Sequence, residues 1–168
     1  MREFSEARYG QEHGKNLIKI SKKLIQNQDL LMLLMNTDLD PTNREKHPQP
    51  IDGLELLNKN IRFVPLLLID DQKTTSKIVL VYDEGDVNSY NSDNENMSLL
   101  INIYCPFEEW LITGDNLRPF AIMSEIRKTL QGARINGLGE LKYLGFSLST
   151  LTEEMGSYVM RFTINAFN

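Results

Sequence analysis

The segment Met97–Cys105 reads MSLLINIYC, and its pattern decides the fold class of this chain. Its residues alternate between an apolar side and a mixed side, which is the period of a β-strand with one face in a core. Pro106–Trp110 forms a short crossing, and Leu117–Gln131 then has the apolar spacing of an amphipathic helix. A strand, a crossing and a helix in this order predict a scaffold unit. The apolar face of the strand consists of Met97, Leu99, Ile101, Ile103 and Cys105.

Apolar spacing predicts the other elements as well. Residues Asn16–Met35 have apolar side chains three and four positions apart, so we expect one long helix there. Pro65 cannot donate a hydrogen bond to a neighbouring strand, so a strand that contains it is expected at an edge or a bulge. Further strands are predicted at Ile61–Ile69, Lys77–Tyr82, Leu144–Leu148 and Tyr158–Ala166.

Turn and capping residues complete the predicted order. Asp115 or Asn116 is expected to cap the second helix, Pro119 suits its first turn, and Gly132 suits a left-handed ending. A turn near Met155–Gly156 makes the last two strands a hairpin. The order helix, three strands, helix, two strands predicts an α+β fold with a mostly antiparallel sheet of about five strands and two main helices on one face.

The chain has 168 residues, of which 41% are hydrophobic, so it is long enough for one domain with a sizeable core. We expect a single domain over residues 16–168, preceded by a polar arm at residues 1–15 that is mobile or ordered only against a partner. Residues 40–60 are rich in proline and charge, which predicts a long irregular insertion. A solvated connector and a contact with another molecule are equally open for it.

The charge of the chain argues against a nucleic-acid clamp. Its formal net charge is -5, whereas a clamp needs basic residues to neutralise phosphates. The first residues lack the apolar core of a secretory signal, and no apolar run approaches the roughly 20 residues of a membrane helix. We expect a soluble protein with no membrane partner.

No set of residues predicts a catalytic or metal site. His13 lies in the polar arm and His47 in the proline-rich insertion, so they lack the spacing of metal ligands. A lone cysteine at an apolar strand position, Cys105, is usually a small buried hydrophobe. Glu108 and Glu109 lie at the end of an element, where we expect them to be solvated. We expect no metal and no cofactor.

One pattern keeps an enzyme open as an alternative. Glu140-Leu141-Lys142 has the Glu-x-Lys form that occurs on a strand of metal-dependent nucleases. Such a site needs a further acidic ligand from a neighbouring strand, and Asp83 is the nearest that the order of elements offers. A three-residue pattern occurs often by chance, so the nuclease is the second reading.

Several stretches share their order and apolar pattern with one protein family. They are Lys77–Tyr82, an acidic hairpin tip, Leu99–Tyr104, Trp110, Arg118–Gly132 and Tyr158–Ile164. In this arrangement the chain resembles the neck and tail-completion proteins of tailed bacteriophages, and most of all the tail terminators. It departs from them in its longer N-terminal arm and in the insertion at residues 40–60.

The resemblance implies a non-enzymatic virion protein that forms a homo-hexameric ring at the head-proximal end of the tail and is assembled in the host cytoplasm. Such a ring ends growth of the tail tube, joins the tail to the head connector, and surrounds a passage through which DNA moves without specific binding. Its partners are the tail tube protein and other neck proteins. A head-completion or stopper protein is the alternative within this class, and a small binding adaptor is a third class.

Two sets of residues are the predicted sites of such a ring. The last strand has a mixed second face, which predicts a subunit contact or a second layer, or else a solvated face with two apolar residues. The acidic loop repels phosphate, which predicts a place facing the passage or a neighbouring ring. The predicted subunit interface is Val159, Arg161, Thr163 and Phe167, and the predicted passage or docking loop is Asp83, Glu84, Asp86, Asp93 and Glu95.

Overall fold

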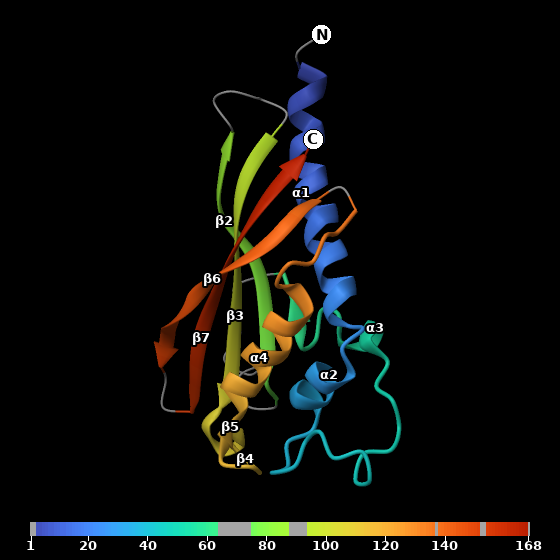
Figure 1. Cartoon of the computed structure of the whole chain (residues 1–168), viewed down its shortest axis with the longest axis vertical. Coiled ribbons are helices and arrows are strands. Elements are labelled where there is room, and N and C mark those ends of the chain that lie inside the picture. Colours follow the sequence, from blue (N-terminus) through green and yellow to red (C-terminus); the bar gives the residue numbers. More distant parts are fainter. Residues whose placement is uncertain (1–2, 64–74, 88–93, 137, 152–153, 168) are drawn as a thin grey trace.

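The chain folds as an α+β unit in which one mixed sheet is covered by helices on one face (Figure 1). The computed structural model describes residues 3–63, 75–87, 94–136, 138–151 and 154–167, and the surroundings of side chains at 13–63, 75–83, 96–136, 138–149 and 154–164. The helices are α1 (Glu3–Leu24), α2 (Gln28–Met35), α3 (Gly53–Leu56) and α4 (Arg118–Leu130). The strands are β1 (Ile61–Arg62), β2 (Lys77–Val87), β3 (Asn94–Pro106), β4 (Leu111–Ile112), β5 (Asn116–Leu117), β6 (Leu138–Leu151) and β7 (Met155–Phe167).

The main sheet has the strand order β1-β2-β3-β7-β6, and β4 and β5 form a separate ribbon. Only β1 and β2 are parallel, and the other neighbours are antiparallel. The predicted α+β class and the mostly antiparallel sheet are therefore confirmed. β3 and β7 lie at the centre, so two segments that are far apart in the sequence form the middle of the sheet.

The core lies between the sheet and helices α1, α2 and α4. The predicted apolar face of β3 is confirmed, because every second residue from Met97 to Cys105 is buried there. On β7 the buried face includes Met160, Phe162 and Ile164, which pair across the ladder with Ile101, Leu99 and Met97. Each fully buried side chain of this kind contributes about 1.5–3 kcal/mol.

The single helix predicted at Asn16–Met35 is wrong in two respects. Helix α1 begins at Glu3, so residues of the expected arm are helical, and the chain leaves the helix before Asn27. Asn27 caps α2, since its side-chain oxygen accepts a bond of 3.1 Å from the amide of Leu30. Its amide group donates to the carboxylate of Glu125 at 2.9 Å and to the hydroxyl of Thr129 at 2.8 Å, so the break is fixed against α4.

Strand lengths differ from those predicted. β1 ends at Arg62, and the remainder of the expected strand to Ile69 falls largely outside the described residues. β2 and β3 extend beyond the expected boundaries and pair as far as Val87 and Glu95, so the acidic segment is in part regular hairpin. The insertion at residues 40–60 includes the short helix α3.

Helix α4 begins at Arg118, one residue after the predicted start, and Leu117 is its N-cap without a side-chain bond. The predicted cap by Asp115 or Asn116 is therefore wrong. Asp115 instead has a positive φ of 53° in the turn between β4 and β5. The predicted left-handed ending is confirmed, because Gly132 has a φ of 72°.

Candidate interaction surface

Strand β6 lies at the edge of the sheet, and only its first half is covered. The segment after α4 runs beside it: Leu141 donates to the carbonyl of Ala133 at 3.1 Å, and Gly132 donates to the carbonyl of Leu141 at 2.9 Å. The side chain of Gln131 then accepts a bond of 2.7 Å from the amide of Tyr143. These bonds occupy the outer backbone edge of β6 as far as Tyr143.

The second half of β6, Leu144–Leu151, is here called the open edge. Within the described part of the chain, no hydrogen bond reaches it except from β7. Large apolar side chains are exposed on it: Leu144 to 64%, Phe146 to 51% and Leu148 to 52%. Residues 144–151 carry no charge and no proline. An uncharged, apolar strand edge is a template for pairing with another chain.

The strand predicted at Leu144–Leu148 is confirmed as part of β6, and its alternating apolar side chains are exposed. Phe146 and Leu148 pair with Met160 and Tyr158 across the ladder, so they lie on the helix-bearing face of the sheet. The register shifts between Tyr143 and Gly145, and beyond this shift Phe146 and Leu148 are only about half covered.

An aromatic cluster lies beside the open edge. It consists of Phe107, Trp110, Phe120, Phe146 and Tyr158. The ring of Phe120, in the first turn of α4, lies 6.0 Å from that of Phe146 and 5.2 Å from that of Tyr158. Phe107 and Phe120 are partly exposed as well. The apolar surface therefore continues from the open edge onto α4 and the turn after β3.

Cations form a second feature, here called the basic strip, made of Lys23, Arg127 and Lys128. Lys23 and Lys128 line one shallow depression between α1 and α4, and Lys128 and Arg127 line the next. The guanidinium of Arg127 stands 4.9 Å from the ring centre of Tyr143 on β6, whereas Lys142 pairs with Thr163 and lies on the opposite face of the sheet. All four cations are exposed, and Lys128 pairs with Glu125 at 2.7 Å.

A fifth cation, Arg118, is fully buried at the start of α4. Its guanidinium donates to four backbone carbonyls: Glu109 at 2.7 Å, Leu33 at 2.9 Å, Asn36 at 2.5 Å and Asp38 at 2.7 Å. Carbonyls at the end of a helix have no partner within it, so Arg118 satisfies the end of α2 and joins it to α4. We call this group the arginine hub.

The arginine hub includes a buried carboxylate. Glu109 lies 4.0 Å from Arg118 and accepts a bond of 3.0 Å from the hydroxyl of Ser76. Burial raises the pKa of Glu109, while Ser76 and Arg118 oppose that rise. Burial also lowers the pKa of Arg118. The expectation of a solvated Glu109 is wrong because a cation and a hydroxyl accompany it into the interior, whereas Glu108 is exposed.

Cys105 is fully buried, as predicted, and burial raises its pKa to about 12. A thiol with so high a pKa is almost never a thiolate near neutral pH. Its backbone carbonyl accepts a bond of 2.9 Å from the indole of Trp110. Cys105 therefore belongs to the core.

The predicted subunit interface lies on the face of β7 opposite the helices. Val159 is buried, Arg161 is exposed and Thr163 is partly buried. Phe167 pairs with Asn94 at the end of the ladder, and its side chain lies outside the described set. Val159 and Arg161 pair with Ser147 and Gly145 of the open edge, on the face of the sheet opposite Phe146 and Leu148, and only Arg161 of the two is exposed.

The predicted passage or docking loop lies at the free end of the β2–β3 hairpin. Asp83 is exposed there, and Glu84, Asp86 and Glu95 occupy strand positions whose side chains are outside the described set. Asp93 is outside the described residues. Figure 1 shows this hairpin end at the top of the view and the end of β6 at the lower left.

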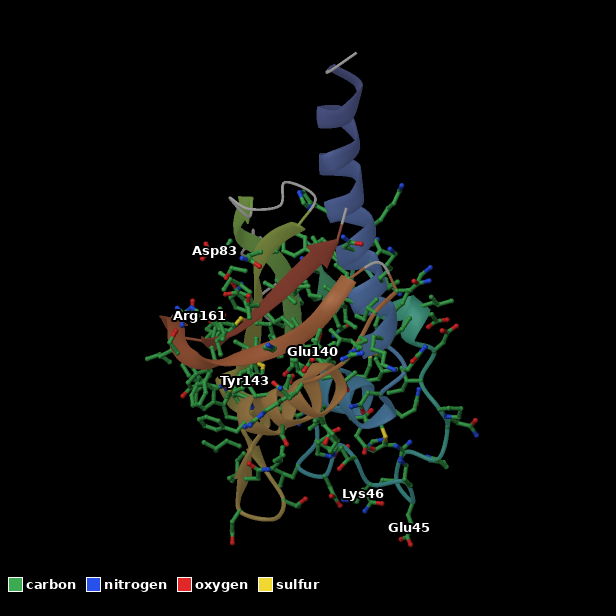
Figure 2. All side chains as sticks on the ribbon, turned by 45° about the horizontal axis from the view of Figure 1, so that its top comes forward. Glu45, Lys46, Asp83, Glu140, Tyr143 and Arg161 are labelled. Atoms are coloured by element: carbon green, nitrogen blue, oxygen red, sulfur yellow. The ribbon has the colours of Figure 1, made fainter. Side chains whose placement is uncertain are left out.

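The residues of the alternative nuclease site lie on different strands. Glu140 and Lys142 are on β6, and β7 and β3 separate them from Asp83 on β2. Figure 2 shows Asp83 and Glu140 on separate parts of the sheet. Among the described residues, no three His, Cys, Asp or Glu side chains form a group that could hold a metal ion. None of the described helices is long and apolar enough to span a membrane.

The family model YomW matches residues 27–164. The chain belongs to the YomW family. The YomW match begins at Asn27, the cap of α2, and ends in β7, so it includes the arginine hub, the aromatic cluster and the open edge. No curated protein matches the chain.

Two features of this surface carry no signal in the hydrophobic pattern of the sequence. Arg118 occupies a helix start and carries no signal of burial, because its carbonyl partners come from α2, from the loop after it and from Glu109. Exposure of Phe146 has no signal either, since alternation shows which side chains share a face but not what covers that face.

Proposed function

We propose that the chain is a structural subunit of a bacteriophage neck or tail-completion ring, in the manner of a tail terminator, and that copies meet at the open edge. The observation that carries this proposal is the open edge itself, where large apolar side chains and unpaired strand backbone coincide. A monomer that exposed both would be prone to aggregation, so a built-in partner is the physical reason to keep them.

The remaining surface agrees with this role. The sheet offers β6 at one edge, where a strand of a neighbouring copy can pair with it. The aromatic cluster adds large, rigid side chains next to the edge, which is the composition of the core of a protein interface.

The first test is the mass of the purified protein in solution, alone and with tail tube protein, by light scattering and native mass spectrometry. We expect a discrete oligomer that also binds the end of assembled tubes. A strict monomer that never joins a tube contradicts the proposal. In the phage, deletion of the gene should leave tails of uncontrolled length, whereas tails of normal length without heads would indicate a stopper protein.

A matched pair of variants tests the surface. Leu144→Ser with Leu148→Ser removes two exposed leucines from the open edge, and Leu39→Ser with Leu54→Ser removes leucines of similar exposure, 59% and 61%, from elsewhere. Losing half-exposed leucines from a contact costs about 2 kcal/mol, which is about 30-fold in dissociation constant. We expect this weakening for the first pair only.

A further inference from the structure

We infer that the outer surface of α1 and α4 binds the phosphate backbone of duplex DNA without regard to sequence, so that the helix-bearing face of the sheet lines the passage of the ring. The place of the DNA rests on the proposed function, because neighbours joined at the open edge continue the sheet around the ring and turn one of its faces inward. The contact itself follows from the charge and composition of this surface.

Positive charge is concentrated on these two helices, although the chain as a whole has a net charge of -5. Residues 13–28 contain four lysines and no aspartate or glutamate. Lys22 and Lys23 are three and four positions after Lys19, so the three lie on one face of α1. Together with the basic strip they form a surface that we call the basic face, which consists of Lys19, Lys22, Lys23, Arg127 and Lys128.

The cations of the two helices belong to one surface. α1 and α4 cover the same face of the sheet (Figure 1), and Lys23 and Lys128 line the same depression between them. Arg127 lines the next depression together with Lys128. Glu125 balances the charge of Lys128 at 2.7 Å, whereas within the described residues Lys22, Lys23 and Arg127 make no ion pair. The basic face therefore keeps exposed positive charge that the described part of the chain does not neutralise.

The uncharged side chains around these cations favour a phosphate backbone over a protein partner. Besides the cations, the two depressions are lined by amides and hydroxyls, of which Gln26, Ser124 and Gln131 are exposed. Lysine and arginine together with such polar side chains are the groups that contact DNA phosphates. The core of a protein interface is instead rich in aromatic side chains and poor in lysine, which describes the aromatic cluster and the open edge.

The length of the basic face suits a duplex. Residues 15–23 of α1 span about 12 Å, since a helix rises about 1.5 Å per residue. Duplex DNA carries one phosphate charge per about 1.7 Å of its axis, so an equal length presents about 7 phosphates. The duplex therefore offers a phosphate for each of the five cations of the basic face. Contacts with phosphates carry no sequence information, and proteins that bind in this way slide along DNA.

The experiment measures binding of a short, fluorescently labelled DNA duplex by anisotropy at several salt concentrations. One variant carries Lys23→Gln and Arg127→Gln, which removes a cation from each helix of the basic face. The matched control carries Lys46→Gln and Lys59→Gln, which removes two exposed cations from the insertion and changes the net charge equally. For the first variant we expect a salt slope that is smaller by about 2 and a dissociation constant that rises at least about tenfold near 50 mM salt. The control should bind like the wild type.

Three outcomes overturn the DNA contact. The first is a wild-type protein that does not bind the duplex at low salt, and the second is an equal loss of binding in both variants, each checked for folding by circular dichroism. The third is binding of a labelled poly-glutamate peptide without binding of the duplex, which would assign the basic face to an acidic protein.

The mass of the wild-type protein separates this inference from the proposed function. A discrete oligomer that shows one of these three outcomes leaves the ring proposal standing. A strict monomer that binds DNA through the basic face supports the contact and overturns the ring.

Discussion

The arginine hub and the open edge both depart from the usual distribution in which charged side chains are exposed and large apolar side chains are buried. At the hub a charged side chain is fully buried, and at the edge large apolar side chains are exposed. The difference lies in their partners. Every polar group of the hub that we describe has a hydrogen-bond partner within the chain, whereas among the described residues the backbone of the open edge is hydrogen-bonded only to β7. The hub therefore stabilises the fold, whereas the open edge is the surface that we propose for assembly.

The largest effect is expected from breaking the hub. Arg118→Leu leaves four carbonyls and the buried Glu109 without their cation, so we expect a loss of about 3–5 kcal/mol in the free energy of unfolding. Arg127→Leu makes the same change in the same helix at an exposed position, where only the contact with Tyr143 is lost, about 0.5–1 kcal/mol. Urea unfolding of both proteins measures the difference. Equal losses would show that the hub does not hold α2 to α4.

Two phenylalanines on the same face of the sheet, one buried and one exposed, separate the effect of a side chain on folding from its effect on association. Phe162 is fully buried, and Phe162→Ala should destabilise the chain by about 3–5 kcal/mol. Phe146→Ala removes an exposed ring and should cost about 1 kcal/mol in folding, but it should weaken self-association. Unfolding in urea and mass at matched concentration measure the two properties. A Phe146→Ala protein that associates like the wild type counts against the open edge as an interface.

A smaller effect tests whether the aromatic cluster is fixed by the fold. A Cβ atom at Gly156 would stand 3.1 Å from a ring atom of Phe107 and closer still to Trp110, so Gly156→Ala should displace the indole and cost about 1–3 kcal/mol. Gly14→Ala is the control, because a Cβ atom there meets nothing within 4 Å. Within α1 it should stabilise by about 0.5–1 kcal/mol. Thermal unfolding measures the decrease in stability expected for Gly156→Ala and the increase expected for Gly14→Ala.

The smallest effect concerns the loop that follows α2 next to the hub. Hydrogen bonds from Asn43, Thr113 and Lys46 lower the pKa of Asp40 from 3.8 to about 2. Because the folded pKa is the lower one, this carboxylate contributes stability above pH 3.8, and the contribution is lost as the pH falls toward 2. Asp40→Asn should therefore flatten the decline of stability between these values. Urea midpoints at several acidic pH values measure it, and an unchanged decline would contradict these bonds.

The sequence predicts the parts of the fold that depend on periodicity. Alternation from Met97 to Cys105 identified a buried strand face, and the glycine at position 132 identified the end of α4. The break at Asn27 was missed because the apolar spacing continues across it, although Asn27 followed by Asp29 is a recognisable helix start. The hub and the open edge depend on which distant segments meet or fail to meet, and no local pattern contains that information.

The most direct test of the open edge is backbone hydrogen exchange at low and at high protein concentration. At high concentration, peptides within residues 144–151 should become protected, because a neighbouring copy covers their edge. Residues 139–143 should exchange equally at both concentrations, since the segment after α4 already covers them within one chain. Equal exchange of residues 144–151 at both concentrations, in a protein whose mass does increase, would contradict the assignment of the contact to the open edge.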